Sequence, residues 1–318
     1  MIKNNHKILN IKSKEQLSHL LGTCYPYLLQ MARNPQYYQF SIPKKSGGIR
    51  IIQAPNDQHK RLQSKINRIL QQLYSDMDIG CVYGFNQSQP EHIKANAQHH
   101  IQKQQVFNTD IKNFFPNISS AKVRDTFIST PFFFDESLAT LIAMLTTYNN
   151  ALPIGAPSSP IISNYIFYNT DKKLKAFANN NDLSYSRYAD DLTFSSNSKI
   201  TGKLITKIYK IIEDDCFVIN TKKSRLQQYY NRQTVTGITV NEKVNINRKY
   251  IRKIRAILHD IKYRGLELAT QRFFNLSLPD FRKESELINI LRGRIEFVGF
   301  VRGKEDPVYL GLKNSIIK

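Results

Sequence analysis

Apolar residues recur along this chain at two spacings, and each spacing predicts a different kind of element. Leu62, Ile66, Ile69, Leu70 and Leu73 lie one to four positions apart on one side of a helical wheel, so they predict one apolar face of a helix. The same spacing predicts helices at 14–33, 57–74, 121–148, 161–177 and 200–214. Short runs rich in β-branched and aromatic residues predict strands at 105–110, 185–188, 192–195, 218–220 and 235–240.

Two pairs of β-prone runs predict hairpins. In the first, a Ser-Gly-Gly turn separates the runs 39–42 and 49–52. In the second, Asp190 and Asp191 lie between two runs, and a tight turn would hold both carboxylates near one point in space. The pair 214–215 is also Asp-Asp, but it lies near a predicted helix end and is expected to be structural.

A third acid completes a possible metal site. Asp110 ends the predicted strand 105–110, and Ile-Lys-Asn-Phe-Phe follows it. Magnesium prefers oxygen ligands in octahedral geometry, and two such ions can clamp the attacking and the leaving oxygen of a phosphoryl transfer. That chemistry requires an acid from a separate strand beside Asp190 and Asp191, and Asp110 is the natural candidate.

The charge of the chain points to its partner. Lysine and arginine number 46 against 25 acidic residues, which gives a net charge of +21 and indicates nucleic acid or an acidic membrane surface. No apolar run approaches 18 residues and the N-terminus lacks a secretory signal, so we expect a soluble cytoplasmic protein. A membrane-surface role would need a more exposed apolar face than the sequence offers, so nucleic acid is the expected partner. The three cysteines form no CxxC motif, which argues against a zinc site.

Five blocks of the sequence resemble the motifs of reverse transcriptases, in the order that the family has them. Tyr-Ala-Asp-Asp at 188–191 resembles motif C, and Asp-Ile-Lys-Asn-Phe-Phe-Pro at 110–116 resembles motif A. Leu-Pro-Ile-Gly-Ala-Pro-Ser-Ser-Pro at 152–160 is similar to motif B. Pro-Lys-Lys-Ser-Gly-Gly-Ile-Arg at 43–50 resembles the fingers hairpin, and Asn-Thr-Lys-Lys at 220–223 resembles motif D.

Two further blocks narrow the resemblance to the bacterial retron reverse transcriptases. Asn-Ala-Gln-His-His at 96–100 fits their NAxxH element, and Val-Thr-Gly at 235–237 fits their VTG element. The chain departs from the family at Ile154, where motif B commonly has glutamine, and this puts one polar contact in doubt.

The resemblance implies an α+β fold with right-hand polymerase architecture. It implies fingers, a palm built on a small antiparallel sheet, and a helical thumb. The expected division is an N-terminal helical extension at 1–35, fingers and palm at 36–240, and a basic thumb or RNA-binding region at 241–318.

The resemblance also implies which residues do the chemistry. Asp110, Asp190 and Asp191 would hold two Mg²⁺ ions, for which Mn²⁺ can substitute, with help from the backbone carbonyl of Ile111. Lys223 would protonate the departing pyrophosphate, and Lys222, which precedes it in motif D, competes for that role.

The incoming deoxynucleoside triphosphate would meet a separate set of residues. Lys45 and Arg50 of the hairpin would bind the triphosphate, and the alternative for Lys45 is a solvated tip. Phe115 would exclude a 2′-hydroxyl group, unless it is a core aromatic. The backbone of the motif B loop would approach the new base pair at Gly155, Ala156 and Pro157.

RNA is expected to contact the two retron elements and the thumb. Asn96 and His100 are four residues apart and could share a helical face, where His100 would either touch RNA or pack internally. The family associates the region of Val235, Thr236 and Gly237 with recognition of its own RNA. The basic face of an amphipathic helix near residue 250 would track phosphates, and its central members are Arg252, Lys253 and Arg255.

The expected function is therefore that of a retron RNA-directed DNA polymerase. Such an enzyme uses a cognate noncoding RNA as template and primer, starts from a guanosine 2′-hydroxyl, and makes branched RNA–DNA (msDNA). An associated effector protein and a role in anti-phage defence belong to the same expectation. The alternatives are an intron-like or diversity-generating reverse transcriptase, an RNA-dependent RNA polymerase, and a non-catalytic RNA-binding scaffold.

Overall fold

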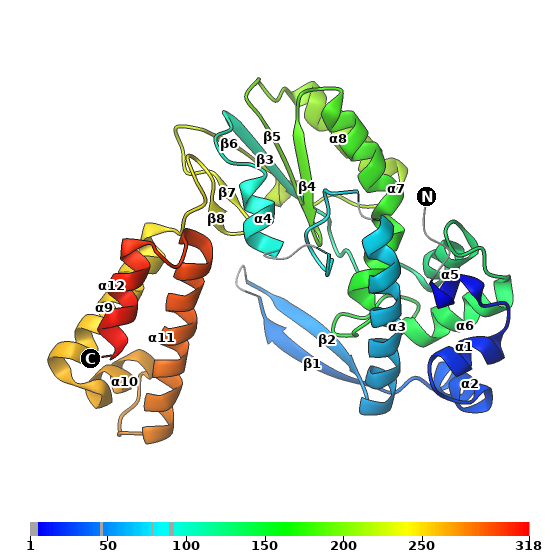
Figure 1. The fold of residues 1–318 in the computed structure, drawn as a ribbon, viewed down its shortest axis with the longest axis horizontal. Helices are drawn as coiled ribbons and strands as arrows, with labels where there is room; N and C mark the ends of the chain where they lie inside the picture. Colours follow the sequence, from blue (N-terminus) through cyan, green and yellow to red (C-terminus); the bar gives the residue numbers. More distant parts are fainter. Residues whose placement is uncertain (1–5, 45–46, 78, 89–91, 318) are drawn as a thin grey trace. The chain divides into compact units, whose positions relative to one another are not determined.

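The computed structural model describes residues 6–44, 47–77, 79–88 and 92–317. The chain divides into two compact units. The first unit contains Met1–Ala95 and Phe107–Leu226, and the second contains Asn96–Val106 and Gln227–Lys318 (Figure 1). This division differs from the expected one, because the N-terminal 35 residues belong to the first unit and residues 227–240 belong to the second.

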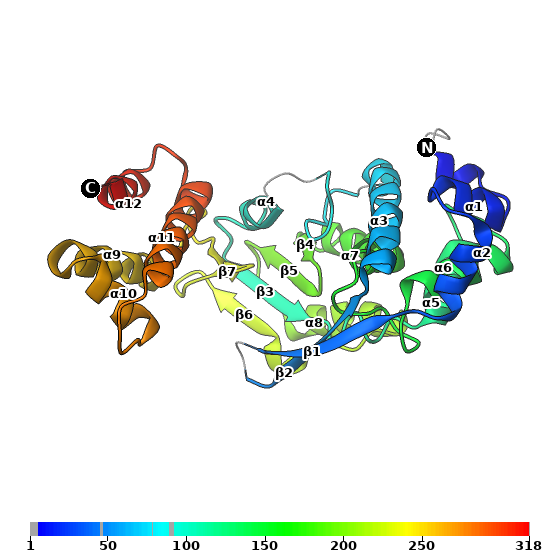
Figure 2. The same ribbon diagram turned by 90° about the horizontal axis from the view of Figure 1, so that it is seen from below.

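A four-stranded sheet with the order β4-β5-β3-β6 forms the centre of the palm. Its strands are β3 (Gln105–Asp110), β4 (Ser184–Tyr188), β5 (Asp191–Ser196) and β6 (Arg225–Gln228). The helices α7 (Ser159–Asn179) and α8 (Gly202–Asp214) pack against each other and against this sheet (Figure 2). Phe107 of β3, for example, contacts Phe194 of β5 and Tyr209 of α8.

Alternation along the strands gives the sheet two faces, one of which packs against α7 and α8. Tyr185 pairs with Phe194 in the register of β4 and β5, and both side chains are buried on the helix side. Because successive side chains point to opposite faces, Asn108 and Asp110 of β3 point away from the helices, as does Asp191 of β5. The acids that end β3 and begin β5 therefore share the face opposite these helices.

The fingers contain a hairpin and a bundle of helices. Strands β1 (Tyr37–Pro43) and β2 (Ile49–Pro55) pair antiparallel, as predicted. The backbone N–H of Gln53 donates to the carbonyl of Ile154 at 2.7 Å, which ties β2 to the motif B loop. The helices of this bundle are α3 (Asp57–Met77), α5 (Ser120–Ile128) and α6 (Glu136–Thr146), and α4 (His92–Gln98) lies at the boundary of the first unit.

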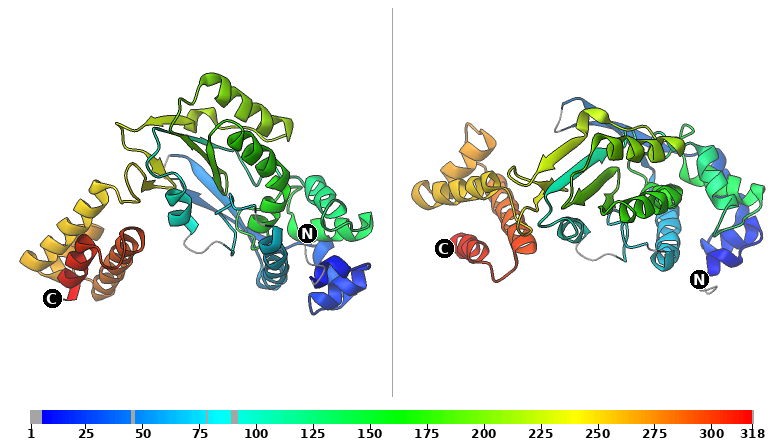
Figure 3. Two further views of the ribbon diagram at one scale, coloured as in Figure 1. Left: turned by 45° about the horizontal axis from the view of Figure 1, so that its top comes forward. Right: turned by 90° about the horizontal axis from the view of Figure 1, so that it is seen from above.

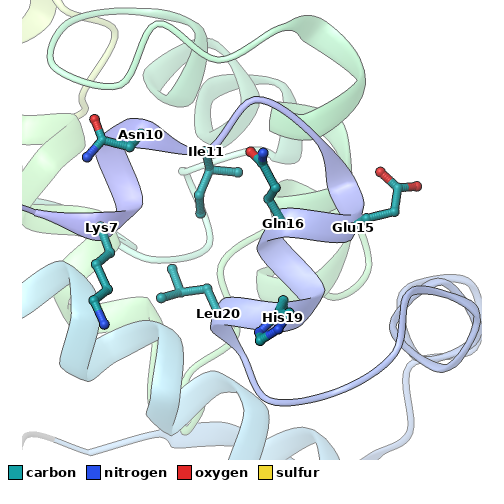
Figure 4. A pocket seen from close by; sticks show the side chains of 7 residues that line it. All are labelled: Lys7, Asn10, Ile11, Glu15, Gln16, His19 and Leu20. Carbon is teal, nitrogen blue, oxygen red and sulfur yellow. The ribbon is translucent and has the colours of Figure 1, made fainter.

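The N-terminal segment packs onto the fingers. It forms η1 (Lys7–Asn10), α1 (Lys14–Leu20) and α2 (Tyr25–Arg33), and α2 lies against α6 (Figure 3). His6 contacts Asp76 of α3 at 2.9 Å, and the Lys65 ammonium group of α3 donates to the Leu21 carbonyl at 2.6 Å. A pocket of about 640 Å³ opens between η1 and α1, and side chains such as Lys7, Gln16 and His19 line it (Figure 4).

The second unit is mainly helical. Its C-terminal part consists of α9 (Arg248–Arg264), α10 (Leu266–Phe274), α11 (Phe281–Arg302) and α12 (Pro307–Ile317), which confirms the helix-rich prediction. Its sheet is the small hairpin of β7 (Thr234–Val235) and β8 (Ile238–Thr239). None of the helices in the described ranges combines the length and the apolar character needed to cross a bilayer.

Four predicted elements differ from the structure. The helix predicted at 14–33 is broken at Gly22, whose φ of +65° ends α1. The helix predicted at 121–148 is divided by an aromatic loop before Asp135, which caps α6. The segment 218–220 makes one β-bridge, at Ile219, and 235–240 folds into a hairpin with a turn at its second residue.

Candidate active site of the palm

The turn between β4 and β5 presents the Asp190–Asp191 pair. Tyr188 pairs with Asp191, so the turn consists of Ala189 and Asp190. Ala189 has a φ of +58°, in the left-handed region that is costly for a residue with a Cβ atom. The backbone N–H of Ile111 donates to the carbonyl of Asp190 at 3.0 Å, which brings the end of β3 against this turn.

Asp110 lies beside the acid pair and has two polar partners from the segment after α8. The ammonium group of Lys223 lies 3.0 Å from both carboxylate oxygens of Asp110. The side-chain amide of Asn220 donates to the same carboxylate at 3.2 Å, and its backbone N–H donates to the Asp110 carbonyl at 2.7 Å. Asn220 precedes the short helix η2 (Thr221–Lys223) and Lys223 is its last residue, so motif D contacts motif A directly.

The pKa values show that the three carboxylates act on one another. Partial burial raises the pKa of Asp190, and the charge of Asp110 raises it further. Loss of hydration raises the pKa of Asp191 to about 7, and the charges of Asp190 and Asp110 contribute in the same direction. For Lys223, partial burial alone would lower the pKa, but the contact with Asp110 and the three negative charges outweigh burial and raise it.

This set of side chains fits a divalent metal ion by its chemistry. Three carboxylates supply hard oxygen donors. The raised pKa values of Asp190 and Asp191 reflect partial burial together with neighbouring like charges, which a cation would neutralise. The fit is one of chemistry and not of ligand geometry, because within the described ranges no group of three or more His, Cys, Asp or Glu side chains is arranged to hold a metal ion. The Lys223 ammonium group lies against the Asp110 carboxylate and balances its negative charge.

The motif B loop contacts the fingers hairpin at Gly155. This residue is exposed and has a φ of +118°, and a Cβ atom there would lie 2.8 Å from the Ile52 side chain. Glycine is therefore required for the close approach of the loop to β2. Ala156 is buried and Pro157 is half-buried, so any ligand contact at Ala156 would be made by its backbone.

Of the two basic residues expected to bind the triphosphate, the structure describes only Arg50. Arg50 is exposed on β2, and it is close enough to lower the pKa of Asp190 through its charge. Lys45 lies outside the described residues.

Phe115, the expected sugar-gate residue, lies beside two other aromatic rings. It is half-buried, and its ring lies 5.7 Å from the Phe114 ring and 6.1 Å from the Phe85 ring. Phe114 is buried, and its ring packs against the rings of Phe167 and Phe217. The Phe115 ring therefore packs against its aromatic neighbours while part of the side chain stays accessible to solvent.

Comparison with known proteins identifies the family. Residues 42–245 match the family described as reverse transcriptase (RNA-dependent DNA polymerase). The chain belongs to the reverse transcriptase family. The retron Ec86 reverse transcriptase of Escherichia coli is 33% identical over 230 residues, which cover 71% of this chain and 70% of that protein. The retron Mx65 reverse transcriptase of Myxococcus xanthus is 30% identical over 243 residues.

These comparisons confirm the predicted retron type and the right-hand polymerase fold. The match to the Mx65 protein covers 70% of this chain but only 55% of that protein, so this chain spans little more than half of its length. Telomerase from Candida albicans, solved with a fragment of telomeric RNA, superposes with a TM-score of 0.50 at 10% identity. That superposition covers 90% of this chain and 64% of the telomerase chain.

The two retron elements of this reverse transcriptase lie in the second unit, and they are largely internal. Asn96, His100 and Val235 are each at most 1% exposed, so their side chains do not present a surface to RNA. Burial lowers the pKa of His100 well below its ordinary value, which keeps the ring neutral. The alternative of internal packing therefore describes His100 better than direct contact with RNA.

Backbone contacts connect the segment after NAxxH to the VTG hairpin. The N–H of Gln102 donates to the carbonyls of Val240 and Asn241, at 3.2 and 3.0 Å. The fully buried Gln233 side chain donates to the carbonyl of Lys103 at 2.9 Å. These bonds give the VTG turn a rigid base.

Thr236 and Gly237 form the accessible part of the VTG element. They make the turn between β7 and β8 with φ angles of +47° and +86°. A β-branched residue with positive φ is strained, and such strain is concentrated at functional sites. Gly237 is exposed and Thr236 is half-buried.

The basic face of α9 has the predicted form. Arg252, Lys253 and Arg255 are exposed, whereas Ile251 and Ile254 are buried. The helix therefore packs by its apolar stripe and leaves its cations available for phosphate groups.

Several residues that position the site carried no role in the sequence prediction. They are Gly84, where a Cβ atom would lie 2.4 Å from the Ala189 nitrogen, and the buried polar residues Asn164, Asp171 and Arg187. Arg187 precedes the acid pair by three residues, so a basic residue in an otherwise buried strand was the available signal. Asn220 begins motif D, but its bond to Asp110 depends on tertiary structure.

Proposed function

We propose that this protein synthesises DNA on an RNA template from deoxynucleoside triphosphates. The proposal rests on one observation: Asp110, Asp190, Asp191 and Lys223 lie close together where strand β3 ends and strand β5 begins. Three mutually repelling carboxylates destabilise a folded protein unless they serve a cationic ligand, which makes a purely structural role a poor explanation.

Two Mg²⁺ ions, or Mn²⁺ in their place, would be held by the carboxylates of Asp110, Asp190 and Asp191 and the carbonyl of Ile111. Such ions stabilise negative charge on the attacking and leaving oxygens of a phosphoryl transfer. The cofactor assignment rests on the hard oxygen donors and on the raised pKa values of Asp190 and Asp191.

The protein residues bind and orient the reactants. Arg50 is suited to the triphosphate, because a guanidinium group makes paired contacts with phosphate oxygens, and Lys45 of the same hairpin is proposed to assist it. The backbone at Gly155, Ala156 and Pro157 lies along the proposed path of the new base pair. Alignment and charge complementarity of this kind supply most of the rate enhancement in phosphoryl transfer.

Lys223 is the better candidate for the general acid. Both lysines are exposed on the same short helix, but the ammonium group of Lys223 lies 3.0 Å from the Asp110 carboxylate. Its raised pKa keeps the ammonium group protonated at neutral pH, so a proton is available at Nζ for the departing pyrophosphate.

We further propose that the template and primer belong to one structured noncoding RNA. Synthesis would begin at a guanosine 2′-hydroxyl and leave a branched RNA–DNA product. The support is the likeness to retron reverse transcriptases and the presence of both retron elements. Thr236 and Gly237 at the VTG turn, with Arg252, Lys253 and Arg255 of α9, are the proposed RNA contacts. An effector protein and anti-phage defence in the bacterial cytoplasm complete this proposal.

The first experiment expresses the protein with its neighbouring genomic DNA. We expect a small DNA joined to RNA in wild-type extracts and none with Asp190→Asn/Asp191→Asn, while Asp214→Asn serves as a matched control with normal product. If no branched product forms but purified protein extends a DNA primer on RNA, the polymerase proposal stands and the retron proposal falls. Absence of both activities would favour the RNA-binding scaffold.

A further inference from the structure

A fully buried polar network lies directly behind the catalytic turn. Arg187 of β4 and Asp171 of α7 are both 0% exposed. The guanidinium group donates from Nε to Asp171 Oδ1 at 2.8 Å and from Nη2 to Oδ2 at 2.6 Å. Tyr185 donates its hydroxyl proton to Asp171 Oδ1 at 2.7 Å, so both carboxylate oxygens are satisfied.

The third nitrogen of Arg187 reaches the turn itself. Nη1 donates to the carbonyl of Ala189 at 3.0 Å and to Oδ1 of Asn164 at 3.0 Å. Ala189 has the strained φ of +58°, and the next carbonyl, that of Asp190, is held by the N–H of Ile111. Two hydrogen bonds to consecutive carbonyls therefore hold a turn that its own residues do not favour.

The same network is anchored to the helix that follows motif B. Asn164 and Asp171 are seven residues apart, so they lie on one face of α7. Asn164 also donates to the carbonyls of Gly84 and Phe85, at 3.1 and 3.2 Å. Asn164 therefore holds two neighbouring residues of the site. Gly84 packs against the Ala189 nitrogen, and the ring of Phe85 lies beside Phe115.

Stability alone does not account for this arrangement. Placing an ion pair in the interior costs several kcal/mol per ion, and apolar residues of similar size often replace such pairs with no loss of stability. A buried guanidinium group can supply something that an apolar side chain cannot, namely a fixed donor for the Ala189 carbonyl.

We propose that Arg187, clamped by Asp171 and Asn164, is a positioning residue that sets the turn at the geometry in which Asp190 and Asp191 bind metal. This inference rests on the proposed function, because it takes the acid pair to be metal ligands. Groups that orient metal ligands typically change metal affinity or activity by about 10- to 100-fold when they are removed.

The test separates positioning from stability with an apolar replacement. The triple variant Arg187→Met/Asp171→Leu/Tyr185→Phe removes both charges and also the Tyr185 hydroxyl group, which would lose its partner without Asp171, so the core can repack. Phe127→Leu, a core change in α5, is the control for destabilisation. The measurements are thermal unfolding and binding of Mn²⁺ alone to the full-length protein, followed by electron paramagnetic resonance without nucleic acid.

We expect the triple variant to bind Mn²⁺ at least about tenfold more weakly than the Phe127→Leu control of equal melting temperature. Unchanged Mn²⁺ affinity would overturn the proposal. Arg187→Lys is the second variant, in case the triple variant does not fold. A lysine keeps the positive charge next to Asp171, but it lacks the branched guanidinium group that also donates to the Ala189 carbonyl. It should weaken Mn²⁺ binding likewise, and wild-type affinity in this variant would also overturn the proposal.

Primer extension distinguishes this inference from the proposed function. In the variants kcat should fall while KM for the template–primer stays unchanged, because the nucleic-acid contacts are intact. If the wild type binds Mn²⁺ in an Arg187-dependent way but synthesises no DNA, the positioning role stands and the polymerase proposal fails. If the wild type binds no Mn²⁺ at this site, both fail.

Discussion

Replacing Asp191 by asparagine should stabilise the metal-free protein while it abolishes DNA synthesis. Asp191 has its pKa raised from 3.8 to about 7 because the folded protein dehydrates it and places two carboxylates beside it. In the unfolded chain the carboxyl group ionises freely. The folded state is therefore penalised increasingly as the pH rises from about 4 to about 7, and the penalty is complete above pH 7.

The size of the effect follows from the two pKa values. A shift from 3.8 to about 7 corresponds to ~4 kcal/mol at ~1.4 kcal/mol for each tenfold change in the acid constant. The Asp191 side chain is exposed, so solvent screens much of this energy, and we expect ~1–2 kcal/mol. For a unit of this size, that gain raises the melting temperature by about 2–8 °C.

Thermal unfolding followed by circular dichroism, with EDTA present, measures this gain. Asp191→Asn should melt above the wild type at pH 8, and the difference should shrink at pH 5. Asp214→Asn is the matched control, because this exposed residue belongs to the other Asp-Asp pair, at the end of α8, and it should show no such pH dependence. An equal difference at both pH values, or a less stable Asp191→Asn variant at pH 8, would refute the reasoning.

Adding Mg²⁺ should reduce or reverse the difference, since a ligand stabilises the state that binds it. The wild type should gain stability with metal concentration at pH 8, and Asp191→Asn should gain less.

Three further changes test other parts of the site. Gly155→Ala should lower the free energy of unfolding by about 1–3 kcal/mol and raise KM for the deoxynucleotide, because the methyl group would push the motif B loop away from β2. Melting curves measure the change in stability, and steady-state kinetics measure the change in KM. Phe115→Ala should increase ribonucleotide incorporation, measured as the ratio of kcat/KM for dCTP and rCTP, and an unchanged ratio would remove its gate role. Changing Arg252, Lys253 and Arg255 together to glutamine should reduce the slope of log Kd against log salt by about 2–3 for an RNA–DNA duplex in fluorescence anisotropy.

The elements with a local signal were predictable from the sequence. The apolar face of α3, the β1–β2 hairpin and the strand that ends at Asp110 each depend on residues a few positions apart. The same holds for the turn that carries Asp190 and Asp191. The motifs of the reverse transcriptase family also have fixed internal spacings, so their order alone identified the chemistry.

Errors in the predicted elements also have local causes. The helix over 14–33 was overextended because a positive φ at Gly22 outweighs the apolar periodicity around it. The strand over 235–240 was assigned across a turn, because Thr236 is β-branched and gave no indication of a left-handed conformation.

Contacts between distant residues were decided only by the tertiary structure. Lys223 and Asp110 are 113 residues apart, and nothing in motif D distinguishes Lys223 from Lys222 until the short helix is placed against β3. Burial likewise decides the roles of Asn96 and His100, because sequence shows which side chains can bind RNA but not which ones face the core.

The sequence by itself thus determined the chemistry of the site, since three aspartates in family motifs define the reaction class. Only the tertiary structure revealed how the site is held. The Arg187–Asp171 pair, the bond from Asn164 and the close approach of Gly84 depend on which side chains share an interior with the strained turn. Such contacts have no local signature, because each partner alone is an ordinary polar or small residue whose energy depends on what the fold places next to it.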